Sequence, residues 1–232
     1  MKNNISASQY FNENWKKYQQ TIQSNTLYHK EMTATLNTFL NDHFSSKPFS
    51  FVDVGCGDSS TIISVLTNQS IQHYIGIDAA EDVLKLAADN LKSIKAKKEF
   101  ICDNMVNAIS QLPPSIDVIY TSYAIHHLSH QQKVDFIQTC QDKLSKNGFL
   151  IMIDGILKPN QTRDQWLTAL ETRMHTTQHL SPEELTFRMQ HPRKDDHPES
   201  IATFKTIATQ QHWKNFQVPL EKDICAFMIF TK

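Results

Sequence analysis

The stretch FVDVGCGDSS, residues 51–60, contains two of the five glycines of the chain, placed two apart behind an acidic residue. Its first four residues are typical of a buried strand, and the glycines indicate a tight turn where the backbone can approach a ligand closely. A dinucleotide-binding loop carries a third glycine, but Ser59 or Ser60 stands at that position here. The pattern that fits is Asp-x-Gly-x-Gly, with Asp53 just inside the end of the strand. We therefore expect a ligand site at a strand-to-helix turn.

Composition narrows the classes of protein to which the chain can belong. The 232 residues are 40% hydrophobic and 20% charged, with a formal net charge of -1. One α/β domain with an appendage is expected, and the near-neutral charge argues against a nucleic-acid partner. The four cysteines show no metal-ligand or disulfide spacing, and the sequence has no long apolar run. We expect a cytoplasmic protein with no membrane partner, and its oligomeric state stays open.

Short apolar runs alternate with amphipathic stretches beyond residue 48. Five of these runs predict strands, each followed by a helical pattern or a loop that leads to one: FSFVDVG, HYIGID, EFICD, IDVIYTS and GFLIMID. This alternation is typical of a parallel sheet with helices on both faces. The later runs NFQVPL and DICAFMIFTK predict an antiparallel hairpin at the edge of the sheet.

Two helices of this α/β pattern have clear signals. Residues 81–94 place five apolar side chains on one helical face, which predicts a packed crossover helix. Residues 129–148 begin with a capping box from Ser129 to Gln132 and end with Asn147 and Gly148. We expect this second helix to stop at the asparagine and glycine in a left-handed conformation.

Two further segments lie outside the strand and helix alternation. Residues 1–46 are polar with interleaved aromatics and predict an N-terminal helical lid, in which Tyr10, Trp15, Tyr18 and Tyr28 cover a bound ligand. Anchoring of these helices to the core would explain the same aromatics equally well. Residues 47–232 then form the main domain, with a helical cap inserted at about residues 155–199, because that connection is too long for a simple loop.

Carboxylates end three successive predicted strands. Asp53, Asp78 and Asp103 would lie along one edge of a parallel sheet, where such folds bind ligands. The matching ligand has a positive centre, a ribose diol and an exocyclic amine, and S-adenosyl-L-methionine has all three. Two plainer roles stay open: Asp78 begins a DAAE capping box, and Asp103 could be a turn residue.

With these residues the chain resembles the class I S-adenosylmethionine-dependent methyltransferases over residues 50–155. VDVGCGD looks like the first motif, GID the acidic end of the second strand, CDN the adenine-side motif and YTSYAIHHL the fourth-strand motif. The resemblance implies a Rossmann-like, seven-stranded, mostly parallel sheet with the last strand antiparallel beside the fifth. It also implies cofactor contacts from Asp53, Gly55, Cys56, Gly57, Asp78, Asp103, Asn104, Ser122 and Tyr123. The chain departs from many members at the serine pair, where they carry a further glycine.

The resemblance also bears on the methyl acceptor. TSYA replaces the Asn/Asp-Pro-Pro-Tyr run of enzymes that methylate exocyclic amines of DNA bases, and no Pro-Cys nucleophile is present. We expect methylation of a nitrogen, oxygen or sulfur atom of a small molecule held between the lid and the cap. The catalytic candidates are His127 and Asp154. The candidates for binding the acceptor are Tyr18, Tyr28, His126, His191 and Asp196, although helix capping explains Asp196 equally well.

Three alternatives compete with this interpretation. His175 and His179 have metal-ligand spacing on a helix, but no third ligand is fixed by spacing, so no metal is expected. The chain could instead be a non-catalytic module that binds S-adenosylmethionine and regulates a partner. A nicotinamide-dependent oxidoreductase is less favoured, because the third glycine is missing and Asp103 is acidic.

Overall fold

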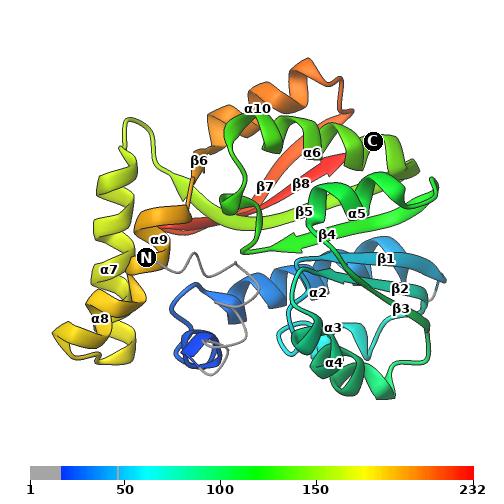
Figure 1. Cartoon of the computed structure of the whole chain (residues 1–232). Coiled ribbons are helices and arrows are strands. Elements are labelled where there is room, and N and C mark those ends of the chain that lie inside the picture. The colour runs from blue at the N-terminus through cyan, green and yellow to red at the C-terminus, as the bar shows by residue number, and fades with distance from the viewer. Residues whose placement is uncertain (1–16, 46) are drawn as a thin grey trace.

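The computed structural model describes residues 17–45 and 47–232. An eight-stranded sheet runs through the molecule in the order β3-β2-β1-β4-β5-β8-β7, and β6 pairs with β5 (Figure 1). The strands are β1 (Phe49–Val54), β2 (Ile71–Asp78), β3 (Lys97–Cys102), β4 (Ile116–Ser122), β5 (Leu144–Leu157), β6 (Glu199–Ser200), β7 (Asn215–Glu221) and β8 (Cys225–Thr231). Strands β1 to β5 pair in parallel, while β8 is antiparallel to both β5 and β7. The predicted mostly parallel sheet and its hairpin are confirmed, and β6 is an additional two-residue strand.

Helices cover both faces of this sheet (Figure 1). They are α2 (His29–Phe44), α3 (Ile63–Leu66), α4 (Glu81–Asn90), α5 (Met105–Gln111), α6 (His130–Lys143), α7 (Arg163–Gln178), α8 (Pro182–Arg188), α9 (Gln190–Asp195) and α10 (Ile201–Gln210), and residues 17–23 are also helical. Apolar side chains of α5, α6 and α10 pack on one face of the sheet, and those of α2, α3 and α7 pack on the other. Alternate residues of β1 serve the two cores, so Phe51 and Val52 lie on opposite faces.

The capping box of Ser129 and Gln132 starts α6 as predicted, but the predicted end of this helix is wrong. The helix ends at Lys143, and the chain continues directly into β5. Gly148 lies inside that strand without a left-handed backbone. A Cβ atom at this residue would stand 2.8 Å from the Ile116 carbonyl oxygen of β4. The glycine is therefore explained by close contact between strands and not by a helix stop.

Three helices, α7 to α9, fill the long connection between β5 and β6 and stand beside one end of the sheet (Figure 1). Helix α7 buries Trp166, Leu167, Leu170 and Met174, and Ser181 and Glu184 form the capping box that starts α8. Within the described residues, no helix has the length and apolar character needed to cross a membrane. The division into lid, main domain and cap stays a prediction, and Tyr10 and Trp15 lie outside the described residues.

Candidate active site

A cavity of about 510 Å³ opens at the carboxyl ends of β1 to β4. Ligands of open α/β sheets bind at this place because loops from several parallel strands meet there. The cavity brings together all but one of the residues for which the resemblance implied cofactor contacts, and these are Gly55, Cys56, Gly57, Asp78, Asp103, Asn104, Ser122 and Tyr123. Tyr18, from the helical residues 17–23, also lines it.

The glycine loop after β1 needs its glycines for backbone conformation and for space. Gly55 and Gly57 have positive φ angles of 71° and 52°, and a Cβ atom on Gly55 would lie 2.7 Å from the Cβ atom of Ala124. Ser59 also has a positive φ of 57°, and its buried hydroxyl lies 3.0 Å from the hydroxyl of Tyr74. The helix expected directly behind the loop is short, because α3 begins only at Ile63 and has four residues.

Two acidic residues hold the rim of the cavity through backbone contacts. The carboxylate of Asp78 accepts hydrogen bonds from the amides of Gly57 and Ala80, both at 2.9 Å. Burial raises the pKa of Asp78. Since Ala80 is the N-cap residue of α4, the alternative that Asp78 merely caps this helix is wrong. Asp103 accepts hydrogen bonds from the backbone and side-chain nitrogens of Asn104, so its turn role and its place at the cavity coexist.

Asp53 is the residue of the predicted cofactor set that does not line the cavity. Its side chain is buried on the same face of β1 as Phe51, and its carboxylate accepts a hydrogen bond of 3.0 Å from the Tyr74 hydroxyl. Burial raises the pKa of Asp53 to about 7, although this hydrogen bond opposes the shift. The alternation of side chains along the strand thus turns Asp53 into the core, and the predicted direct contact with a cationic ligand is wrong.

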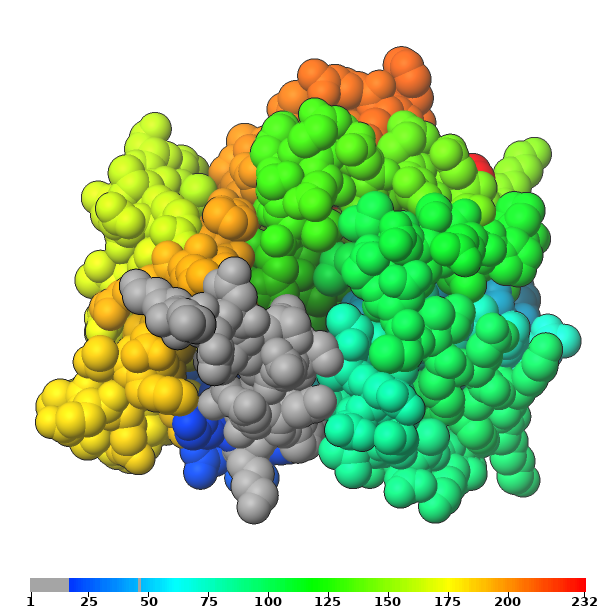
Figure 2. All heavy atoms as spheres, viewed as in Figure 1, coloured from blue at the N-terminus to red at the C-terminus, as the bar shows by residue number. Residues whose placement is uncertain are grey.

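A second cavity, of about 160 Å³, adjoins the first. Tyr18, Tyr123 and His127 line both cavities. The second cavity is largely apolar, with walls from α7, α8 and the start of β8, and its polar end contains His126, His191 and Asp196. In Figure 2 the α7 to α9 segment, in yellow and gold, lies on the same face of the molecule as the green middle part of the chain. Four of the five predicted acceptor-binding residues therefore meet at one cavity.

Tyr28 and Asp154 do not line either cavity. The Tyr28 ring lies under the Arg173 guanidinium at 3.5 Å, where it fixes the start of α2 to α7. Asp154 is buried within β5, which continues to Leu157, and does not end the strand as predicted. Its carboxylate accepts hydrogen bonds from Nδ1 of His126 at 2.5 Å and from the His126 amide at 3.0 Å. Asp154 therefore positions His126, and its predicted catalytic role stays a prediction.

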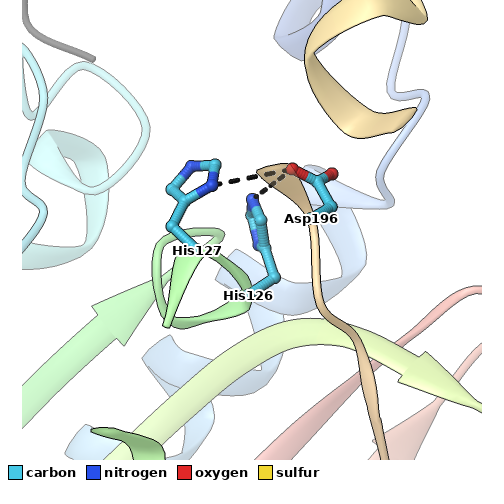
Figure 3. A group of neighbouring side chains, drawn as sticks. All are labelled: His126, His127 and Asp196. Carbon is cyan, nitrogen blue, oxygen red and sulfur yellow. Dashed lines mark ion pairs between the residues drawn. The ribbon is translucent and has the colours of Figure 1, made fainter. Parts of the chain in front are cut away.

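The side chains of His126, His127 and Asp196 point toward one another (Figure 3). Oδ1 of Asp196 lies 3.7 Å from Nε2 of His126 and 3.6 Å from Nδ1 of His127. Burial alone would lower the pKa of His126, but Asp154 and Asp196 raise it to about 9. Burial and the neighbouring His126 lower the pKa of His127. Two adjacent imidazoles thus have opposite preferences for a proton.

Two basic residues that sequence analysis missed hold this cluster together. Lys133 is 1% exposed, and its ammonium donates hydrogen bonds to the carbonyls of Leu128, at 2.5 Å, and His197, at 2.7 Å. Arg163 donates from Nε to the Asp196 carbonyl at 2.7 Å. These bonds join the loop after β4 to the end of α9. Nothing in the sequence distinguishes Lys133 from a lysine on the solvent side of a helix.

The sheet order, the glycine loop and the acidic rim are the features that the resemblance to class I S-adenosylmethionine-dependent methyltransferases implied. Residues 52–150 match the model of a methyltransferase domain family. The chain is thus a methyltransferase, and S-adenosylmethionine is its cofactor.

Two curated relatives are methyltransferases named as uncharacterized. The one from Bacillus licheniformis is 22% identical over 202 residues, which cover 87% of each chain. YrrT from Halobacillus halophilus is 24% identical over 165 residues, which cover 71% of this chain and 74% of the relative.

Solved structures share the fold. The plantazolicin methyltransferase BamL, in complex with a triazolic desmethylPZN analog and SAH, has a TM-score of 0.65 at 17% identity, with 98% of this chain and 94% of that chain covered. Magnesium protoporphyrin IX methyltransferase from Synechocystis has a TM-score of 0.65 at 13% identity, with 97% of each chain covered.

Proposed function

We propose that the protein transfers the methyl group of S-adenosylmethionine to a nitrogen, oxygen or sulfur atom of a small molecule in the second cavity. The observation that carries this proposal is the shared boundary of the two cavities at Tyr18, Tyr123 and His127. Methyl transfer is an in-line displacement, so a donor and an acceptor must meet at about 3 to 3.5 Å with water removed. Because the two cavities share three lining residues, a cofactor in the first cavity and an acceptor in the second would be close enough to react.

The lining of the second cavity supports an acceptor with an apolar body and a polar reacting end. Trp166, Leu170 and Met174 supply apolar walls, while His126 and Asp196 stand at the polar end. Two enzymes of similar fold are named for plantazolicin and magnesium protoporphyrin IX, which are small molecules. The net charge of -1 supports an acceptor other than nucleic acid. The free thiols of all four cysteines support a reaction in the reducing cytoplasm.

The acceptor can be identified by incubating the protein with methyl-labelled cofactor and a cell extract and analysing the products by mass spectrometry. Leu170→Trp should fill the second cavity without touching the first, so label transfer falls while calorimetry shows unchanged affinity for S-adenosylhomocysteine. Leu86→Trp, at a leucine that is 43% exposed, is the matched control and should retain transfer. Label found only in protein, nucleic acid or lipid would contradict the proposal.

A further inference from the structure

The cluster at the polar end of the second cavity has the composition of a metal site. We infer that His126, His127 and Asp196 bind one divalent transition-metal ion of the Zn²⁺ type. Two imidazole nitrogens and one carboxylate oxygen are a ligand set that zinc accepts. One such atom from each residue lies within 4.8 Å of the other two. His126 and His127 lie in the loop after β4, and Asp196 is the C-cap residue of α9 (Figure 3).

The distances suit ligands that share an ion better than they suit hydrogen bonds. Oδ1 of Asp196 is 3.7 Å from Nε2 of His126 and 3.6 Å from Nδ1 of His127, which exceeds hydrogen-bond length. Tetrahedral ligands at about 2.1 Å from zinc stand about 3.4 Å from one another. To bind an ion between them, Oδ1 of Asp196 and each of the two imidazole nitrogens would therefore need to approach by only a few tenths of an ångström.

An unsatisfied carboxylate oxygen points independently to a ligand. The Asp196 side chain is only 7% exposed, and among the described residues its Oδ1 atom has no hydrogen-bond partner. The same holds for Nδ1 of His127. A buried polar atom without a partner is costly, so native structures usually satisfy it with protein, water or an ion. One ion at this point would satisfy both atoms.

The surroundings orient the ligands as metal sites require. Nδ1 of His126 donates to Asp154, which leaves Nε2 directed at Asp196. A carboxylate behind a histidine in this way fixes the tautomer of a metal ligand. Lys133 and Arg163 hold the two ligand-bearing segments in register. Because all three ligands line the second cavity, a fourth coordination position can face the acceptor.

A metal at this place narrows the acceptor class, and this consequence rests on the proposed function. The acceptor would carry a hydroxyl, thiol or carboxyl group that loses its proton to solvent and ligates the ion. Its oxygen or sulfur then attacks the methyl carbon, the bond from that carbon to the sulfonium sulfur breaks, and the electron pair stays on sulfur. If His127 binds the ion through Nδ1, its role would be that of a metal ligand, and no proton transfer by His127 would be needed.

The test measures metal binding without acceptor or turnover. Chelator-treated full-length protein is titrated with Zn²⁺ by calorimetry, and with Co²⁺ while its visible absorption reports coordination geometry. We expect one ion per chain, and Asp196→Asn, which alters a ligand, should lose more affinity than the roughly 10- to 100-fold typical of an orienting residue. Asp154→Asn should lose about 10- to 100-fold, because it removes only the orienting carboxylate. His175→Ala/His179→Ala removes two exposed histidines outside the cluster and should bind as wild type.

Calorimetry with S-adenosylhomocysteine on the same samples shows that each variant is folded. It also separates the two proposals, because a protein that binds the cofactor but no metal leaves the methyltransferase function standing. Absence of Zn²⁺ and Co²⁺ binding in the wild type would overturn the inference. Wild-type metal affinity in each of the folded single variants Asp196→Asn and His127→Gln would also overturn it. Loss of metal binding in His175→Ala/His179→Ala would do the same.

Discussion

Replacing Gly55 with alanine tests the account of the glycine loop most directly. The residue has a φ of +71°, and left-handed backbone costs a residue with a Cβ atom about 1 to 2 kcal/mol. The new Cβ atom would also stand 2.7 Å from the Cβ atom of Ala124. Such overpacking costs about 1 to 3 kcal/mol. We therefore expect Gly55→Ala to lower the free energy of unfolding by about 2 to 5 kcal/mol.

Urea unfolding of the wild type, both single variants and the Gly55→Ala/Ala124→Gly double variant separates the two costs. Removing the Ala124 methyl group relieves the clash but not the backbone strain, so the double variant should recover about 1 to 3 kcal/mol of the loss. A loss below about 0.5 kcal/mol in Gly55→Ala would show that the loop relaxes freely, which contradicts the argument. A double variant whose loss equals the sum of the two single-variant losses would rule out the contact with Ala124.

Three further predictions concern the cofactor, pH and the N-terminal segment. Asp78→Asn should weaken S-adenosylhomocysteine binding about 10- to 150-fold in calorimetry, because hydrogen bonds to charged groups contribute about 1.5 to 3 kcal/mol. Unchanged affinity would show that Asp78 is not part of the cofactor site. Burial lowers the pKa of His29 to about 4, below its ordinary 6.5, so the unfolded chain takes the proton first and stability falls as pH drops from 6.5 to 4. His29→Phe should abolish about 3 kcal/mol of that fall in urea titrations, whereas the exposed His175→Phe should keep it. Residues 17–23 should exchange amide hydrogens more slowly with cofactor bound, because Tyr18 and Ile22 line the first cavity; equal exchange would argue against a lid.

The inner strands of the sheet could be predicted because β1, β2, β4, β5 and β8 are largely buried and therefore appear as short, continuous apolar runs. The helix end at Lys143 could not, because Gly148 is explained by contact with Ile116 of another strand, and sequence shows only that a glycine is present. Strand β6 consists only of Glu199 and Ser200, which pair with β5. A strand of two residues is too short to show a periodic pattern in the sequence.

The cofactor loops were predictable because their residues end strands, and parallel strands place such residues at one edge. Asp53 was wrongly predicted to contact the ligand. It lies one residue before the end of β1, and because side chains alternate along a strand, its carboxylate points into the core. Asp196 was named, but its meeting with His126 depends on how α9 folds back, which spacing cannot show. Tyr28 illustrates the converse, since an aromatic in a ligand-covering segment packs instead on Arg173.

The position of β8 between β5 and β7 has a consequence for synthesis on the ribosome. Gln132 is the last residue in the chain that lines the first cavity, whereas the second cavity is also lined by Cys225. At about 5 to 20 residues per second, on the order of 5 to 20 s separate these two residues during translation. From the completion of β5 at Leu157 until β8 is made, β5 lacks the partner that covers its outer edge. An uncovered apolar edge pairs readily with other chains, so the nascent protein is most prone to aggregation after its cofactor loops have already emerged.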